Sequence, residues 1–364
     1  MRELPHYTST SPAVSVLMVV RDAEVSVRRA VESIQNQTLK NVELVVVDAG
    51  SEDSTARQLD AISERDLRVV VVHAGRCSRQ EGLDLALERS RGAWFTVIDA
   101  DGWARPTMLA DLLERAEGRS ADLVVGGFSL ALIEGAGRSS EVTVESEDRD
   151  YPTQHDFRAD AWRLFGSGQL LPASAKLFSR ERAGEWGSRF APAEGGPAED
   201  DHAFVISYLR DVERVSVLPG ACYHVARRLP AESQGLEGAW YRRLEGEHAA
   251  LLGLYRHWGL EGDAASMETL QSRYIEQLVD CVEDVCRVGT PIDLSQRRRI
   301  VEGMLETDQA RVAASVARPG GSHARSLLAP IRAHNTALVC AQARLLSLFR
   351  RGRVVESTIP DTFI

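Results

Sequence analysis

Two carboxylates separated by one residue are the strongest chemical signal in this chain. Asp99 and Asp101 follow residues 94–98 (WFTVI), an apolar run whose length suits a buried parallel strand. Open α/β sheets bind ligands at the carboxyl ends of such strands, and two acids there can hold a divalent cation through oxygen. Because Asp and Gly are also common turn residues, a plain turn after the strand is an equal alternative.

The elements that must carry these acids follow from the alternation of short β-branched runs with amphipathic segments. The pattern predicts strands over residues 14–20, 42–47, 68–72, 94–98 and 123–128, and helices over residues 24–35, 54–63, 79–88 and 106–115. This spacing indicates right-handed βαβ units and a mostly parallel central sheet with helices on both faces. Asp48 and the loop before Arg79 then share one edge with the two acids, which favours the metal site over the turn.

The rest of the chain changes character twice. Residues 130–156 are polar and acidic, which predicts a loop or an edge hairpin, and a mixed region follows over residues 157–229. Residues 240–258, 265–287, 295–317 and 323–349 are apolar at helical spacing, which predicts an all-helical C-terminal region. We therefore expect a polar tail over residues 1–13, an α/β domain over 14–230 and a helical domain over 231–364.

The net charge and its distribution along the chain limit the kinds of molecule that this protein is expected to bind. The formal net charge of −10 argues against a nucleic-acid-binding protein with a broadly basic surface. Residues 309–355 nevertheless hold eight Arg and no acidic residue. Such a tail suits peripheral contact with a membrane face or another anionic partner, and equally a solvated helix face or an intersubunit contact. Apolar stripes on the C-terminal helices also suit a homo-oligomer.

Composition also bears on the compartment. No apolar segment is long enough for a membrane span, residues 1–11 lack the apolar core of a signal peptide, and the five cysteines show no CxxC spacing. We expect a cytoplasmic protein with reduced thiols, whose contact with the inner membrane face is at most peripheral.

Several segments occur in a recognisable order. Residues 45–55 (VVVDAGSEDST), 78–82 (SRQEG) and 92–101 (GAWFTVIDAD) resemble the VVDDGSTDST, RN-x-G and GEYILFLDSDD segments of family 2 glycosyltransferases of the GT-A fold. Residues 176–180 (KLFSR), 198–200 (AED) and 223–224 (YH) resemble the acceptor half of this family, especially of enzymes that attach N-acetylglucosamine to poly(ribitol phosphate) in wall teichoic acid. The resemblance implies the Rossmann-like GT-A fold, with a nucleotide-binding half over residues 14–128 and an acceptor half over 129–230.

The resemblance also assigns residues to the nucleotide sugar, and these are Val19, Arg21, Asp48, Arg79, Asp99, Ala100 and Asp101. Asp48 contacts the nucleotide base, and Arg79 faces the diphosphate. Asp99 lies on the ribose side, and Asp101 binds Mn2+ or Mg2+. A hard cation and an Arg are what a departing nucleotide diphosphate requires, because its charge must be neutralised.

For catalysis, the resemblance makes Asp200 the general base, as the acid of the family's ED pair. Asp201 is the alternative if the register shifts by one residue. One base without a nucleophile implies inversion at the anomeric carbon. Weaker assignments, near the acceptor or the diphosphate, are Trp103, Glu199, His224, Arg227 and Arg228.

The implied function is an inverting, metal-dependent transfer of a sugar from a nucleotide-diphosphate donor, with a UDP-sugar favoured, to a hydroxyl acceptor. The acceptor would be a saccharide or a polyol phosphate, for example in a cell-wall glycopolymer. Ala49, Gln80 and Gly102 depart from the family pattern, which leaves the nucleobase and the metal affinity open. The alternative function is a catalytically degenerate GT-A-like binding or assembly module in which the helical region does the work.

Overall fold

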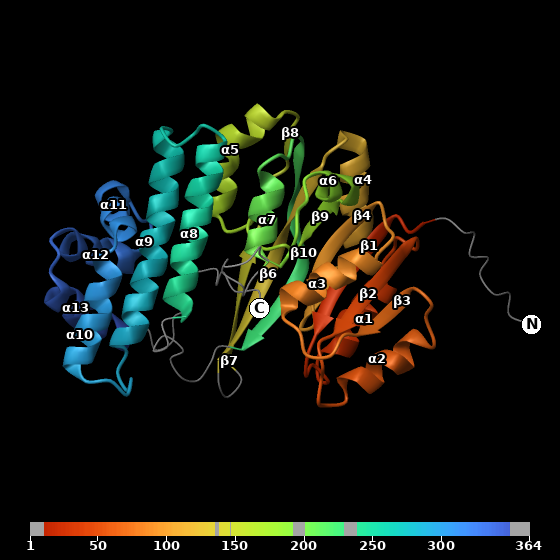
Figure 1. Ribbon diagram of the computed structural model, residues 1–364, viewed down its shortest axis with the longest axis horizontal. Helices are drawn as coiled ribbons and strands as arrows, with labels where there is room; N and C mark the ends of the chain where they lie inside the picture. The colour runs from red at the N-terminus through yellow and green to blue at the C-terminus, as the bar shows by residue number, and fades with distance from the viewer. Residues whose placement is uncertain (1–10, 135–137, 146, 192–200, 229–238, 350–364) are drawn as a thin grey trace, which may run out of the picture.

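The strands of this protein are gathered in its N-terminal two thirds. The computed structural model describes residues 11–134, 138–145, 147–191, 201–228 and 239–349 (Figure 1). The strands in these ranges are β1 (Val14–Val20), β2 (Val42–Asp48), β3 (Val69–His73), β4 (Trp94–Asp99), β5 (Gly102–Ala104), β6 (Leu123–Glu134), β7 (Arg138–Val144), β8 (Arg149–Tyr151), β9 (Lys176–Ser179) and β10 (Val215–Arg228).

All of these strands belong to one sheet with the order β3-β2-β1-β4-β9-β6-β10-β5, while β7 pairs with β6 and β8 with β10. The first four strands in this order are parallel. The short strand β9 runs antiparallel between β4 and β6, and β10 runs parallel to β6 but antiparallel to β5 and β8. The sheet is therefore mixed and mostly parallel, as the sequence predicts.

Helices cover both faces of this sheet. The helices before β10 are α1 (Val27–Gln35), α2 (Thr55–Ser63), α3 (Arg79–Arg89), α4 (Met108–Arg119), α5 (Gln154–Gly166), α6 (Arg180–Glu185) and α7 (His202–Leu209). Along β1, Val16 and Met18 point into a core that α1, α2 and α4 complete, whereas Leu17 points into a second core with α3, α5 and α7. Alternate residues of a strand face opposite ways, so a run of Val and Leu can serve both cores.

The predicted elements of the first third are confirmed to within a few residues. The exceptions concern short or extended strands. The three-residue β5 directly follows the Asp99–Asp101 turn and carries no β pattern of its own, so it is not predicted. The predicted strand over residues 123–128 extends to Glu134 and forms a hairpin with β7, which agrees with the loop or hairpin expected there.

The C-terminal region is helical throughout its described residues. It contains α8 (Ala239–His257), α9 (Ala264–Cys286), α10 (Leu294–Leu305), α11 (Asp308–Val316), α12 (Ser322–Arg332) and α13 (Thr336–Phe349). Two predicted segments are each divided into two helices. Thr307 caps α11 by accepting a hydrogen bond from the Ala310 amide, and His334, with φ of 52°, separates α12 from α13.

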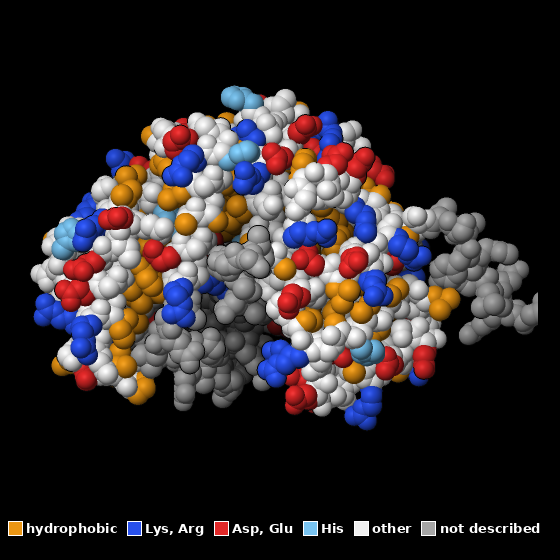
Figure 2. Space-filling view, viewed as in Figure 1, with side chains coloured by type: hydrophobic (Ala, Val, Ile, Leu, Met, Phe, Trp, Pro, Cys, Tyr) orange, Lys and Arg blue, Asp and Glu red, His pale blue; other side chains and the backbone are white. Residues whose placement is uncertain are grey.

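The helical region is not packed as a separate body. Figure 1 shows α8 and α9 beside α5 and α7 of the α/β region. Leu251, Leu254 and Leu270 from α8 and α9 join the same apolar core as α5 and α7, whereas a further core is formed by residues of α8 to α13. In the described part of the chain, no helix has the length and apolarity needed to cross a membrane. Basic and acidic side chains are interspersed on the face shown in Figure 2.

The shared core predicts unequal effects for two tryptophans, one in α8 and one directly after it. Trp258, directly after α8, is 7% exposed, packs edge-on against Phe157 and donates a hydrogen bond to the Arg210 carbonyl. Trp258→Ala should lower the free energy of unfolding by about 3–5 kcal/mol, because it leaves a cavity between the two regions. Trp240→Ala, at a position 39% exposed, should cost less than about 1 kcal/mol. Equal losses in denaturant titrations would contradict the shared core.

Candidate active site

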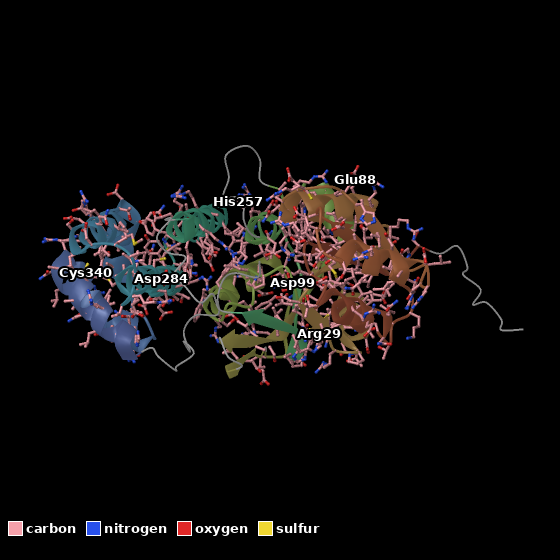
Figure 3. The ribbon with its side chains drawn as sticks, turned by 90° about the horizontal axis from the view of Figure 1, so that it is seen from below. Arg29, Glu88, Asp99, His257, Asp284 and Cys340 are labelled. Carbon is pink, nitrogen blue, oxygen red and sulfur yellow. The ribbon has the colours of Figure 1, made fainter. Side chains whose placement is uncertain are left out.

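The ends of three neighbouring strands place two predicted acids at one edge of the sheet. Val19 and Val20 at the end of β1 pair with Asp99 of β4 on one side and Asp48 of β2 on the other. Both acids are about 95% buried, with 4% of Asp48 and 5% of Asp99 exposed. In Figure 3, Asp99 lies in the α/β part of the molecule near Arg29, well away from Asp284 and Cys340 in the helical region.

Asp48 is held as an ionised acceptor. Its Oδ1 accepts a hydrogen bond from the Ser51 amide at 3.0 Å, and its Oδ2 lies 3.1 Å from Nδ1 of His73. Burial raises the pKa of Asp48, but the hydrogen bonds from Ser51 and His73 outweigh burial and leave this pKa below its usual value. Nε2 of the same imidazole lies 3.0 Å from Asp60, and these two carboxylates raise the pKa of His73. The sequence does not single out His73.

Arg79 contacts both Asp99 at the end of β4 and Asp201 before α7. It is the first residue of α3, whose start is fixed by a capping box between Ser78 and Glu81. Its Nη2 lies 2.7 Å from Oδ1 of Asp99 and 3.6 Å from Oδ2 of Asp201. Burial opposes the charge of Arg79, but the two carboxylates outweigh burial and raise the pKa of this guanidinium. Arg79 is therefore a buried, permanently charged group at the centre of the candidate site.

Tyr223 of β10 fixes Asp99 from the other side. Its hydroxyl accepts a hydrogen bond from the Asp99 amide at 2.7 Å and donates one to Oδ2 of Asp99 at 3.2 Å. The side chain is fully buried, and burial together with Asp99 raises its pKa well above the usual value. The motif containing Tyr223 is visible in the sequence, but the contact depends on β10 pairing with the unpredicted strand β5. The resemblance thus places Tyr223 near the acceptor half, but sequence reasoning does not predict its contact with Asp99.

The same tyrosine explains one departure from the family pattern. A Cβ atom at Gly102 would lie 2.0 Å from the Tyr223 hydroxyl oxygen and 2.6 Å from its Cζ. No side chain fits at position 102 while Tyr223 contacts Asp99, so a further acid directly after Asp101 is excluded by packing.

The loop after Asp99 is held by a stack of side chains. Arg29 of α1 donates a hydrogen bond to the main-chain oxygen of Asp101 at 2.7 Å, and its guanidinium lies 4.1 Å from the ring centroid of Trp103. The indole also stacks on His224, with the ring centroids 5.2 Å apart and the planes 7° from parallel. Trp103 and His224 are brought together by the pairing of β5 with β10. Their predicted contact with acceptor or diphosphate stays a prediction.

The carboxylates that the structure describes at this edge of the sheet are too few to bind a hard cation by themselves, and a bound ligand would have to supply further oxygen atoms. Among the described residues, no group of three or more His, Cys, Asp and Glu side chains is arranged as a metal centre. Asp99 already contacts Arg79 and Tyr223, while Asp101 is partly exposed. Mg2+ commonly takes one or two carboxylates and completes its shell with water and substrate phosphate oxygens. Asp101 fits that role together with a bound diphosphate.

The predicted base lies at the limit of the described structure. Asp200 and Glu199 fall outside the described residues, and the side chains of Arg227 and Arg228 are likewise not described. Asp201, the alternative base, is fully buried as the residue before α7.

The remaining predicted residues lie around the first strand and its neighbour. Val19 lies under α3, where a Cβ atom on Gly82 would come within 2.8 Å of Cγ2 of Val19, so Gly82 allows the helix to approach β1 closely. Arg21 is exposed directly after β1, and Ala100 is partly buried against the core beneath α1 and α4.

Lys176 of β9, in the segment that resembles the acceptor half, has a burial that sequence reasoning does not predict. It is fully buried, and its ammonium donates hydrogen bonds to the main-chain oxygens of Gln169 at 2.6 Å and of Pro172. Burial lowers the pKa of Lys176 to about 7, although the negative charge of Asp201 acts in the opposite direction. In the sequence, Lys176 is one polar residue in a short strand, and nothing there indicates burial.

Part of this chain matches the sequence model of a known protein family. Residues 15–163 match the sequence model of the family described as "Glycosyl transferase family 2". This stretch contains β2 to β8, all of β1 except Val14, and the residues Asp48, Arg79, Asp99 and Asp101.

Two relatives match this chain, one of them over more residues than the family model does. The chain is 30% identical to EpsH of Bacillus subtilis over 149 residues, which cover 41% of this chain and 43% of EpsH. It is 23% identical over 265 residues to the uncharacterized glycosyltransferase EpsJ of the same organism, covering 69% of this chain and 72% of EpsJ.

A solved structure matches the fold over nearly the whole length. The crystal structure of Staphylococcus aureus TarS 1–349 in complex with UDP-GlcNAc superposes with a TM-score of 0.61, covering 96% of this chain and 98% of that one at 16% identity. The likeness supports the GT-A fold expected from the sequence, and it extends into the helical C-terminal region.

The packing of Tyr223 against Gly102 generates a testable prediction. Gly102→Ala should lower the free energy of unfolding by about 1–3 kcal/mol, because the added methyl group overlaps the phenol. In a Tyr223→Ala background the same substitution should cost much less, since the overlapping group is gone. Gly118→Ala on α4 is the control, because a Cβ atom there meets nothing within 4 Å. Equal costs of Gly102→Ala in both backgrounds, measured by chemical denaturation, would show that the overlap is absent.

Proposed function

We propose that this chain is an inverting, metal-dependent glycosyltransferase that moves a sugar from a nucleotide-diphosphate donor to a hydroxyl acceptor. The observation that carries the proposal is the meeting of Asp48, Arg79, Asp99 and Asp101 at the carboxyl edge of the sheet in a family 2 domain. A UDP-sugar is the favoured donor, and the like-folded TarS, which is bound to UDP-GlcNAc, makes that compound the first to test.

The side chains at this edge offer complementary groups to such a donor. Asp48 presents a buried, ionised carboxylate that can accept hydrogen bonds from a nucleobase. Arg79 presents a permanent positive charge that can stabilise the diphosphate as the bond to the sugar breaks. Asp101 would hold Mn2+ or Mg2+, which, when bound, neutralises the departing diphosphate as a Lewis acid.

The base completes the reaction on the opposite side of the sugar. The acceptor oxygen forms a bond to the anomeric carbon, the bond from that carbon to the diphosphate oxygen breaks, and the acceptor's proton passes to a carboxylate. We assign this role to Asp200. The neighbouring Asp201 is fully buried beside Arg79, which suits it to hold that guanidinium rather than to meet an acceptor. Direct displacement of this kind inverts the anomeric configuration.

The acceptor assignment rests on the resemblance and on chemistry. A saccharide or a polyol phosphate, as in a cell-wall glycopolymer, suits a site with Trp103, His224, Arg227 and Arg228 nearby, because Arg binds phosphate well. We also propose a cytoplasmic location, with the Arg-rich C-terminal segment as a peripheral contact to the inner membrane face, and a homo-oligomer as a further use of the helical region. The alternative function is a binding or assembly module that holds a nucleotide sugar without turning it over.

Metal use can be tested through Asp101. Asp101→Asn should raise the Mn2+ concentration needed for half-maximal turnover by at least about tenfold, because it weakens the carboxylate that would hold the cation. The assay is release of UDP from UDP-sugars in a manganese titration, and Asp211→Asn, at an exposed acid beyond α7, is the control. Full activity of the wild type in excess chelator would contradict metal dependence.

The base can be tested by a pair of neighbouring substitutions. Asp200→Asn should lower kcat by about 100-fold to 10,000-fold while leaving donor binding unchanged, as loss of a general base does. Asp201→Asn should instead lower the free energy of unfolding by about 1–3 kcal/mol, because it removes a buried charged partner of Arg79. NMR of the product should show the inverted anomer.

Two outcomes decide against parts of this proposal. If Asp200→Asn keeps full activity and a folded Asp201→Asn loses it, Asp201 is the base. If the wild type binds a nucleotide sugar tightly but releases nucleotide from none, the binding module is correct.

A further inference from the structure

Asp200, the proposed base, and Asp201 directly precede α7 in the sequence. The contacts that hold the first turn of α7 therefore also constrain these two acids. Asp201 precedes the helix and His202 is its first residue. Nδ1 of His202 lies 2.7 Å from Oε2 of Glu247 on α8, and Oε1 of Glu247 lies 3.1 Å from Nη2 of Arg273 on α9. One carboxylate of the helical region therefore connects two of its helices with the start of α7.

This connection is buried and charged. His202 is 2% exposed and Glu247 is 7% exposed. Burial raises the pKa of Glu247, but His202 and Arg273 outweigh burial and lower this pKa to about 2. Glu247 is therefore an ionised acceptor, and Nδ1 of His202 donates the hydrogen bond. A buried pair of this kind has little freedom in its geometry, because a shift would leave an uncompensated charge.

At the last turn of α7, the Tyr208 hydroxyl donates a hydrogen bond to the Asp122 main-chain oxygen at 2.7 Å and accepts one from the Ser179 amide at 3.1 Å. The ring contacts of the helix are less directional. Phe204 packs on Phe178 and Phe190, and Tyr208 packs on Trp186, all within the apolar core. Apolar packing depends on area rather than direction, so it tolerates small rotations of a helix better than a hydrogen-bonded ion pair does. On the α/β side, the start of α7 meets Arg79 through Asp201. The polar contact with Glu247 supplies the matching constraint from the helical side.

We propose that the helical region positions the catalytic base. Glu247, oriented by Arg273, binds His202 and thereby fixes the first turn of α7 and the acid that precedes it. This inference rests on the proposed function, in which Asp200 or Asp201 takes the acceptor's proton. His202, Glu247 and Arg273 are positioning residues, and they act through the backbone of Asp201 and His202.

The chain contains a matched control for this pair. Nδ1 of His323 on α12 lies 2.7 Å from Oε1 of Glu283 on α9, and Glu283 is 1% exposed. This second His–Glu pair makes the same kind of contact at the same distance, with 37% of the His323 side chain exposed, but it joins two helices of the helical region to each other. Loss of either pair removes a His–Glu contact. Only loss of the His202–Glu247 pair removes a contact that holds the start of α7.

The first readout is kinetic. His202→Leu should lower kcat for sugar transfer by about 10-fold to 100-fold, because a small displacement of a base costs that much, while the dissociation constant for UDP stays within about twofold. His202→Asn should recover most of this loss, since its amide nitrogen can donate from nearly the position of Nδ1. Glu247→Gln should lower kcat as His202→Leu does. His323→Leu and Glu283→Gln should leave kcat within about twofold of the wild type.

The second readout does not require activity. Hydrogen exchange measured by mass spectrometry should show at least about tenfold faster exchange in peptides covering residues 201–209 of His202→Leu, and no such change in His323→Leu. This measurement also identifies a variant that has failed to fold, because exchange would then rise throughout the chain. In that event His202→Asn and Glu247→Gln carry the test.

The outcomes separate this inference from the proposed function. If the wild type transfers sugar and His202→Leu matches it in kcat, the positioning role is wrong while the proposed function stands. If the wild type transfers no sugar from any donor, the proposed function fails, and so does the assignment of a base to be positioned. Unchanged exchange over residues 201–209 in His202→Leu overturns the inference whatever the activity.

Discussion

The buried guanidinium of Arg79 is the group on which the arrangement of the site depends. It lies between Asp99, at the end of β4, and Asp201, directly before α7. Buried charges are tolerated when they are paired, so neither acid can move far without leaving Arg79 uncompensated. Gly82 lets α3 lie close enough to β1 to bring Arg79 to this point. One side chain thus couples the two halves of the fold.

The parts of the site that depend on local pattern are predictable from the sequence. Asp48 and Asp99 follow β-branched runs, and parallel strands with helical crossovers must bring their carboxyl ends to the same edge. Arg79 begins a helix whose Ser-x-x-Glu capping box is visible in the sequence. Periodicity and end signals of this kind act over a few residues, and each is present in the chain.

The parts that depend on distant pairing are not predictable in this way. Tyr223 reaches Asp99 only because β10 pairs with β5, a three-residue strand without a pattern of its own. Lys176 is buried in β9, a strand in the middle of the sheet between β4 and β6, although a single Lys in a short strand usually indicates an exposed position. Likewise, helical spacing predicts α8 and α9, but nothing in it indicates that Glu247 faces α7.

The contact between Tyr223 and Gly102 has a consequence for how this site can diverge. A change at position 102 to any larger residue first displaces the phenol that holds Asp99, and a change at position 223 alone leaves an acid with fewer partners. Either substitution alone therefore gives a protein in which Asp99 has lost its contact with Tyr223. The two positions should vary together among descendants of this sequence, so that an acid at position 102 appears only in lineages that have already lost the tyrosine.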